Sequence, residues 1–383
     1  MWYDLLSVQR AVSKTMRHEE EGYLSEQLIT CIGNKRALLG DIEERVLEVK
    51  KELGRDRLSC LDLFSGSGAV ARLLKGHSGR LIANDLERYS YVVNSCHLTN
   101  RGEYDPEAFR HYLHMLNEAY EEKRISGVIT ENYAPKDENN ITKGERVFYT
   151  TENARIIDTY RTNIDALVPE GLRRFFLARL VTEASVHTNT AGVFKGFYKD
   201  KNTGVGKYGG SGENALSRIR GRITLTEPVL SRFECETEVY QKDANELARE
   251  MRGIDLCYID PPYDQHPYGS NYFMLNLILE NRLPQEISAV SGIPRGWNRS
   301  AYNKRKEALA ALEDAVSALD AKYLLVSYNN EGFIGYGEMT EMLGRYGSLS
   351  VREIRYNAFR GSRNLGGRER YTNEYLFLLK KEA

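Results

Sequence analysis

The sequence predicts an α/β protein built on an open sheet whose central strands are parallel. Three observations carry this prediction: an apolar run at 254–259, an apolar run at 58–63 that enters a glycine-rich turn, and an apolar run at 81–84 that ends in Asp85. Near-continuous apolar runs are typical of parallel strands covered on both faces. The chain has 383 residues and is 41% hydrophobic, enough for a large core and about two or three domains.

The other elements follow from the spacing of apolar residues and from turn signals. Gly33-Asn34 indicates a turn that opens a helix over 36–53, and the alternating tail predicts a terminal hairpin. In chain order we further expect helices at 69–74, 106–122, 155–166 and 171–187, a loop at 131–144, a short strand ending in Asp243, a helix at 307–319, a strand at 323–328, and hairpin strands at 349–356 and 374–379.

Composition excludes several classes of protein. The net charge is −1, so a nucleic-acid partner would need local basic patches and not a global field. Five scattered cysteines without a C-x-x-C pair favour a reduced cytosolic protein with no metal site, and Cys60 and Cys257 are expected in the core. No signal peptide, lipidation motif or long apolar run occurs, which predicts a soluble intracellular protein.

The first candidate binding element is the glycine-rich turn. Phe64-Ser65-Gly66-Ser67-Gly68 follows Asp62, and Ala71 stands at the third small-residue position of a nucleotide-binding loop. Asp85 ends the next strand about 20 residues later, where a carboxylate can bind ribose hydroxyls. The structural alternative is that Asp85 only caps the following helix.

Two further polar residues are candidates for the same ligand. Lys35 lies on the tight turn before the first helix, where its ammonium could hold a carboxylate. The alternative is a solvated lysine at a helix start. Asp243, at the end of its expected strand, could reach the amino group of an adenine on a cofactor.

Asp260-Pro261-Pro262-Tyr263 is the sharpest chemical signal. Two prolines fix φ and remove two backbone donors, so they end the 254–259 strand in a stiff loop. A planar amine such as adenine N6 is a poor nucleophile because its lone pair is delocalised. Asp260 and the Pro261 carbonyl could accept both of its protons, and Tyr263 could stack on the base. A proline turn with a capping aspartate is the structural alternative.

Three basic segments are candidate nucleic-acid surfaces. Each combines cations with glycine or aromatic residues, a composition suited to phosphates and bases, although a solvated loop has the same composition. The segments are 195–222, with Lys195, Lys207 and Arg218 among its cations and Phe194 and Phe197 among its rings; 294–306, with Arg295, Arg299, Trp297 and Tyr302; and 359–368, with Arg360 and Arg363. His187, just before the first segment, is expected to be a satisfied residue at a helix end.

Four motifs then align in order: Ile-Gly-Asn-Lys-Arg, Asp-Leu-Phe-Ser-Gly-Ser-Gly, Asn-Asp and Asp-Pro-Pro-Tyr. Together they resemble the DNA adenine-N6 methyltransferases that use S-adenosylmethionine, in the α motif order shared by Dam and many restriction–modification methylases. The resemblance covers about 28–100 and 235–383 and is weak between them. It implies a Rossmann-like mixed sheet of seven strands with helices on both faces. The catalytic domain would be 1–100 and 236–383, and 101–235 an inserted DNA target recognition region.

The resemblance also assigns roles. Lys35 would contact the methionine carboxylate of the cofactor. Phe64, Gly66 and Gly68, with Asp62 before them, would line the methionine and ribose pocket. Asp85 would bind the ribose, and Asp243 the cofactor's adenine amine. The roles at the target adenine fall on Asp260, Pro261, Pro262 and Tyr263. From the basic segments, we expect the residues that contact DNA to be Lys195, Lys207, Arg295, Arg299, Arg360 and Arg363.

The resemblance implies a monomer that flips an adenine out of double-stranded DNA, without a metal, in the cytoplasm of a bacterium or from a phage, possibly beside a restriction endonuclease on another chain. Cytosine-C5 chemistry is excluded because no Pro-Cys pair occurs. Three alternatives stay open: a cytosine-N4 methyltransferase, an RNA adenine methyltransferase, and a non-catalytic Rossmann-type DNA-binding module.

Overall fold

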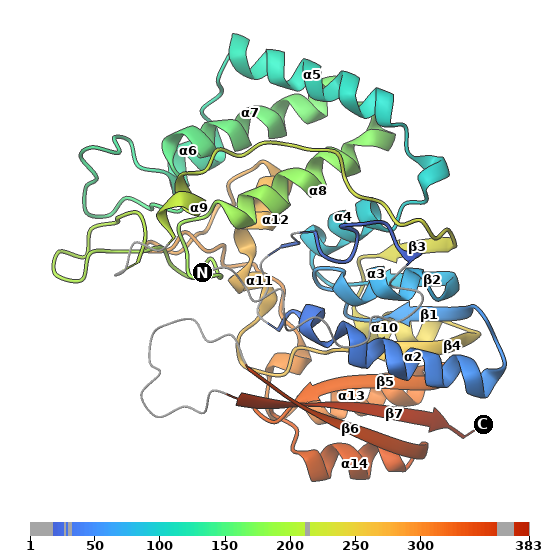
Figure 1. The fold of residues 1–383 in the computed structure, drawn as a ribbon. Coiled ribbons are helices and arrows are strands. Elements are labelled where there is room, and N and C mark those ends of the chain that lie inside the picture. Colours follow the sequence, from blue (N-terminus) through green and yellow to red (C-terminus); the bar gives the residue numbers. More distant parts are fainter. Residues whose placement is uncertain (1–17, 27, 30–32, 211–214, 358–370, 383) are drawn as a thin grey trace.

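A seven-stranded mixed sheet forms the centre of the molecule (Figure 1). The computed structural model describes residues 18–26, 28–29, 33–210, 215–357 and 371–382. The strand order is β3-β2-β1-β4-β5-β7-β6, in which only β7 runs antiparallel to its neighbours. The strands are β1 (Leu58–Asp62), β2 (Ser78–Asn84), β3 (Glu236–Tyr240), β4 (Ile254–Ile259), β5 (Ala321–Asn329), β6 (Gly347–Asn357) and β7 (Tyr371–Lys381).

The parallel strands bring the predicted motifs to one edge. β1 pairs in parallel with both β2 and β4, so the loops that follow these three strands emerge side by side. The chain order reverses between β1 and β4, and such a switch point in an open sheet is where ligands bind. The edge therefore carries the glycine loop, Asp85 and Asp260 together.

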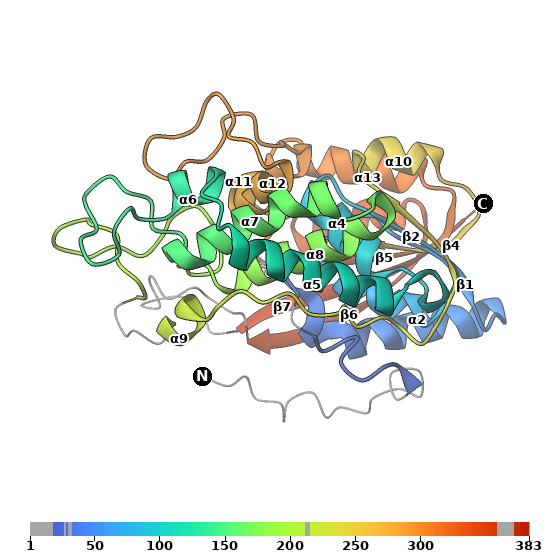
Figure 2. The same cartoon turned by 90° about the horizontal axis from the view of Figure 1, so that it is seen from above.

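Helices cover both faces of the sheet, as the sequence predicted. On one face, Ile42 and Val46 pack with Val70 and Leu74 against β1 and β2. On the other, Leu247, Leu312 and Met339 pack against β4 and β5. Figure 2 shows the two layers on opposite sides of the strands. The first layer consists of a 3-10 turn η2 (Lys35–Leu38), α2 (Leu39–Leu53) and α3 (Ala69–Lys75), and the second of α10 (Ala244–Glu250), α13 (Ala308–Ala318) and α14 (Tyr336–Gly344).

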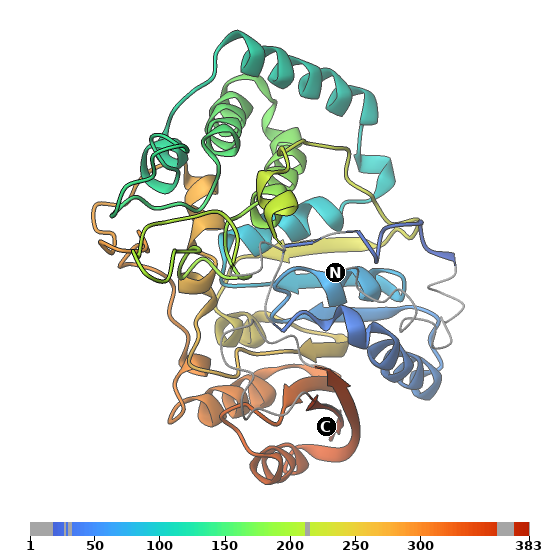
Figure 3. The same cartoon turned by 60° about the vertical axis from the view of Figure 1, so that its left-hand side comes forward.

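A separate group of helices extends from the β3 side of the sheet (Figures 1 and 3). Here α4 packs on α8, α8 on α7 and α7 on α5, so the layers build outward from the sheet. An aromatic-rich core that includes Phe109, Phe148 and Phe176 joins them. The group contains α4 (Arg88–His97), a turn η3 (Arg101–Glu103), α5 (Pro106–Glu122), α6 (Val128–Tyr133), α7 (Thr151–Leu167), α8 (Glu170–Val186), α9 (Leu216–Arg220), α11 (Tyr268–Asn271) and α12 (Phe273–Glu280); a further turn, η4 (Ala301–Asn303), lies beside α13.

Most expected elements occur with bounds shifted by one to four residues, and two expectations need correction. The stretch at 131–144 is not wholly a loop, because α6 extends to Tyr133. The strand expected to end in Asp243 ends at Tyr240. The Asp243 carboxylate instead accepts hydrogen bonds from the amides of Asn245 and Glu246 and caps α10. An aspartate at a helix start satisfies amides that otherwise lack partners, so the cap ends the strand early.

The core expectations for cysteine are confirmed. Cys60 and Cys257 are buried free thiols, and burial raises the pKa of Cys60 to about 12. In the part of the chain that the structure describes, no helix is both long and apolar enough to cross a membrane.

Candidate active site

A cleft opens at the carboxyl edge of the sheet, where the motifs meet. Its open space, including solvent at its mouth, amounts to about 970 Å³. Five acidic side chains but only two basic ones line it, so the cleft favours a cationic ligand. The charged residues are Asp62, Asp85, Glu87, Asp243, Asp260, Lys35 and Lys242, and the other walls include Phe64, Gly66, Pro262, Tyr268, Asn298 and Tyr302.

The glycine loop is locked to the end of β2. The Gly66 amide donates to Asp85 Oδ2 at 2.8 Å, and the Glu87 amide donates to Asp85 Oδ1 at 2.9 Å. Gly68 has φ +82°, and a Cβ there would lie 2.5 Å from Asn94 Oδ1, so only glycine fits. Asp85 thus faces the cleft and closes the turn before α4. It is not the cap of that helix, because the N-cap residue is Glu87 and no side chain caps it.

Asp62 is the most isolated carboxylate of the cleft. It ends β1 and is only 1% exposed. Neither carboxylate oxygen has a hydrogen-bond partner of good geometry among the described residues, although the amides of Phe64 and Ala71 face it. Burial, followed by the charges of Asp260 and Asp85, raises the pKa of Asp62 well above its usual range. A buried charge without a partner is costly, so this position suits a cationic ligand.

The Asp-Pro-Pro-Tyr loop begins with an ion-pair network. Lys35 Nζ lies 2.9 Å from Asp260 Oδ1 and 3.2 Å from Glu374 Oε1, and Ser327 Oγ donates to Glu374 Oε1 at 2.5 Å. Burial raises the pKa of Asp260 to about 6. The charge of Lys35 opposes this rise, and the charge of Glu374 adds to it. Burial by itself would lower the pKa of Lys35, but the charges of Asp260 and Glu374 hold it well above its usual range.

The rest of the loop is fixed from both sides. The Phe333 amide donates to the Tyr263 carbonyl at 3.0 Å, and the Tyr263 ring meets Tyr328 edge-on with centroids 5.9 Å apart. Gly33 has φ +78°, and a Cβ there would come within 2.8 Å of the Tyr263 hydroxyl. Pro261 is buried, whereas Pro262 lines the cleft. The aromatic ring and the carboxylate therefore have set positions.

Comparison with known proteins decides between the alternatives. A family model described as "D12 class N6 adenine-specific DNA methyltransferase" matches residues 32–291. The chain belongs to this family. It is 29% identical over 362 residues to the type II methyltransferase M.NlaIII of Neisseria lactamica, covering 91% of this chain and 98% of that protein. It is 28% identical over 360 residues to M.CviAII of Paramecium bursaria Chlorella virus 1, covering 92% and 98%.

A longer relative shows the same similarity. M.FokI of Planomicrobium okeanokoites is 27% identical over 367 residues, which are 92% of this chain and 52% of that protein. Membership of the family makes this chain an adenine-N6 DNA methyltransferase, an enzyme that takes a methyl group from a donor. Adenine N6 in DNA is thereby favoured over cytosine N4, over RNA and over a non-catalytic module.

The residues expected to touch DNA lie in different settings on this methyltransferase. Lys195 is exposed, with Nζ 3.4 Å from His266 Nδ1, close to the Asp-Pro-Pro-Tyr loop. Lys207 is half-buried. Arg295 is exposed and faces Glu286 at 3.5 Å, and Arg299 lies 4.3 Å over the Trp297 ring. Arg360 and Arg363 fall outside the described residues.

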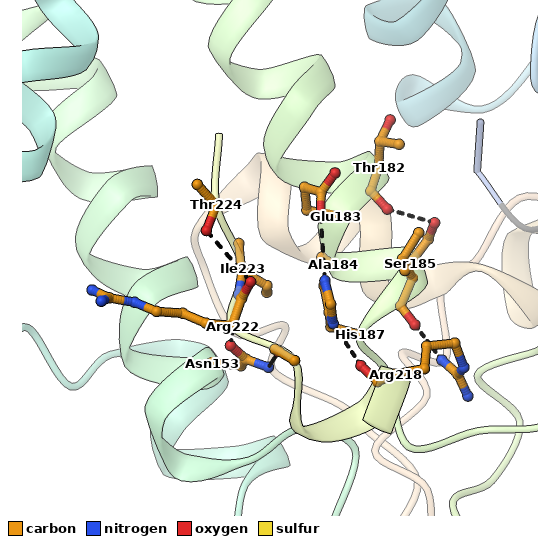
Figure 4. A network of polar contacts seen from close by, with 12 residues as sticks. Asn153, Thr182, Glu183, Ala184, Ser185, His187, Arg218, Arg222, Ile223 and Thr224 are labelled. Atoms are coloured by element: carbon orange, nitrogen blue, oxygen red, sulfur yellow. Dashed lines mark hydrogen bonds and ion pairs between the residues drawn. The ribbon is translucent and has the colours of Figure 1, made fainter. Parts of the chain in front are cut away.

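Part of the 195–222 segment is structural, which corrects its interpretation as a free surface. Phe194 and Phe197 are buried in the helical core and cannot stack on bases. Arg218 donates to the carbonyls of Thr188 and Thr190 at 2.8 and 3.2 Å and so closes the end of α8, where a cation complements the helix dipole. His187 bonds the Arg218 carbonyl at 2.6 Å (Figure 4), and the prediction of a satisfied helix-end residue is confirmed.

Sequence reasoning missed two functional candidates. Glu374, on β7, is buried against Lys35, but in the sequence it is one acid in an alternating strand. Glu87 is buried in the cleft wall, where its carboxylate accepts from Asn276 at 2.6 Å and Asn298 at 3.3 Å. Burial and Asp85 raise the pKa of Glu87 to about 7. No local motif marks either residue, because Lys35, Asn276 and Asn298 lie 150 or more positions away from them in the chain.

Proposed function

We propose that this methyltransferase moves a methyl group from S-adenosylmethionine to N6 of one adenine in a specific double-stranded DNA sequence. The observation that carries the proposal is that Asp260, at the end of β4, faces the same acid-lined cleft as the glycine loop. A donor held by the loop and an amine held by Asp260 would meet at this edge.

The cleft fits the proposed cofactor. S-adenosylmethionine supplies an electrophilic methyl group on a sulfonium and also carries an ammonium. Asp62, with its unpartnered carboxylate, would receive the ammonium. Asp85 would accept the ribose hydroxyls, and Asp243 would accept the adenine amino group. Phe64, Gly66 and Gly68 would shape the pocket, and Lys35 would lie near the methionine carboxylate.

The target adenine would bind between Asp260 and Tyr263. Lys35 contacts Asp260 Oδ1, so Oδ2 and the Pro261 carbonyl would accept the two N6 protons. This draws the N6 lone pair out of the ring and towards the methyl group. As the new N–C bond forms and the S–C bond breaks, N6 becomes positive, and the nearby carboxylates stabilise that charge. One N6 proton then leaves to Asp260 or to solvent.

A base inside the duplex cannot reach this cleft, so the target would be flipped out at a cost of a few kcal/mol. Stacking on Tyr263 and phosphate contacts from Lys195, Lys207, Arg295, Arg299, Arg360 and Arg363 would offset that cost. Residues 101–235 would read the bases. The enzyme would act as a monomer. The type II relatives support a role in restriction–modification, beside an endonuclease on another chain.

The first test is Asp260→Asn, with methyl transfer to DNA and cofactor binding measured separately. We expect transfer to fall by at least about a thousandfold, while cofactor affinity stays within a few-fold of wild type. Asp56→Asn, an exposed aspartate in the loop before β1, makes the same chemical change and serves as the control. Near-wild-type turnover in Asp260→Asn would refute the proposed role.

The second test identifies the DNA sequence. DNA from cells that express the chain is sequenced with detection of N6-methyladenine. We expect the modified base in one short motif, and its absence when Asp260→Asn is expressed. Methylation at N4 of cytosine instead would contradict the proposal.

A further inference from the structure

The surroundings of Lys35 contain a carboxylate that the proposed reaction does not use. Glu374 lies on β7, 0% exposed, and its Oε1 receives both Lys35 Nζ at 3.2 Å and Ser327 Oγ at 2.5 Å. Its strand neighbours in register are Asn329 on β5 and Ile354 on β6, neither of which is a cation. Burying a carboxylate is costly unless a partner compensates its charge. For Glu374, that partner is the ammonium of Lys35.

Lys35 is shared between two carboxylates, which differ in their exposure to the cleft. Asp260 borders the cleft with 17% of its side chain exposed, whereas Glu374 is sealed beneath it. Asp260 would have to engage the target amine, and Lys35 would then lose part of its counter-charge in a site that excludes water. Glu374 keeps the ammonium compensated whether or not Asp260 is engaged.

We propose that Glu374 is a positioning residue, which anchors the Lys35 ammonium beneath Asp260 through the Ser327–Glu374–Lys35 chain and so sets the charge of the Asp260 carboxylate. This inference rests on the proposed role of Asp260. With both carboxylates ionised, the group carries one net negative charge, which favours the positive charge that develops on the attacking amine.

The titratable groups around Asp260 come from several elements. Lys35 approaches from η2, Glu374 from β7, Asp62 from β1 and Tyr258 from β4, and Tyr263 is in its own loop. Lys35 is the cation among them and lowers the pKa of Asp260, while Glu374 raises it. Removing the charge of Glu374 must therefore lower the pKa of Asp260, both directly and by leaving Lys35 to Asp260 alone.

The test is the pH dependence of kcat/KM for Glu374→Gln. Methylation needs Asp260 as a charged acceptor, so the wild-type rate falls as the pH drops through its pKa of about 6. In Glu374→Gln we expect this acid limb to move to lower pH by at least about half a unit, together with a several-fold lower kcat at pH 8. Glu353→Gln, an exposed glutamate on the adjacent strand β6, should leave the limb in place.

An acid limb that stays in place, or moves to higher pH, overturns the inference, even if activity or stability falls. Ser327→Ala is the second variant and decides by the same criterion if Glu374→Gln does not fold. It leaves both acids in place but removes the hydroxyl that holds Glu374 Oε1 beside Lys35, so we expect a smaller shift in the same direction. Asp260→Asn, measured alongside, separates the proposals: if it is inactive while Glu374→Gln keeps the wild-type limb, only the role of Glu374 fails.

Discussion

At the scale of single residues, the site contains several carboxylates whose charges are stabilised to different degrees by the protein. Asp85 is stabilised by two backbone amides, and Asp260 is balanced by Lys35. Among the described residues, neither carboxylate oxygen of Asp62 has a hydrogen-bond partner of good geometry. Groups that cost stability in the free protein are common where a ligand will compensate them. Asp62 is therefore the residue at which stability and binding should oppose each other most directly.

We expect Asp62→Asn to raise the free energy of unfolding at pH 8 by about 1 kcal/mol and to weaken cofactor binding by about tenfold. Because folding raises the pKa of Asp62, the folded state holds the proton longer. Its stability thus falls as the pH rises above the value at which the unfolded carboxyl ionises. The extra stability of Asp62→Asn relative to wild type should therefore become smaller towards pH 4. Urea unfolding at both pH values measures this, and a variant less stable than wild type at pH 8 would contradict it.

At the scale of elements, the site is built where strands and helices end. β1, β2 and β4 end at the same edge of the sheet, and a polar side chain at or after the end of each strand lines the cleft. The start of α10 adds Asp243, whose Oδ1 accepts from the amides of Asn245 and Glu246 at 2.9 and 3.2 Å. One side chain thus serves a helix and, as proposed, a ligand.

These two roles of Asp243 can be separated. Asp243→Ala should cost about 1 kcal/mol of stability through loss of the cap and should also weaken cofactor binding. Asp243→Ser keeps a capping oxygen, so stability should largely return while binding stays weak. Asp105 caps α5 with the same geometry away from the cleft; its Ala variant should lose stability alone. Full recovery of cofactor affinity in Asp243→Ser would contradict a direct contact.

At the scale of the whole molecule, the cleft is bounded by the sheet on one side and by segments joined to the helical group on the other. Tyr268 and Gly269 of α11 line it, and α12 continues from there into contact with α7 and α8. Asn298 and Ser300 line it next to Arg299. A duplex bound over this opening would touch sheet loops and helical group at once, which supports target recognition by residues 101–235.

The basic side chains at this opening should contact phosphates and not bases. We expect Arg299→Ala to weaken binding to all DNA sequences alike and to reduce the slope of log affinity against log salt by about 0.9. The control is Arg345→Ala, an exposed arginine directly after α14 that is paired with Glu313. Fluorescence anisotropy at several salt concentrations gives the slope. A loss confined to one DNA sequence, with an unchanged slope, would contradict a phosphate contact.

Local sequence patterns were enough to predict the parts of the molecule that depend on neighbouring residues in the chain. Apolar periodicity and two prolines placed β4 and its loop, and the glycines at 66 and 68 located the turn whose backbone only glycine adopts. The order of the motifs then pointed to the reaction. The contacts between distant side chains became visible only in the folded molecule. Glu374 meets Lys35 across more than 330 positions, and Arg218 contacts the end of α8. Such contacts depend on how strands and helices pack, and a local pattern does not contain that information.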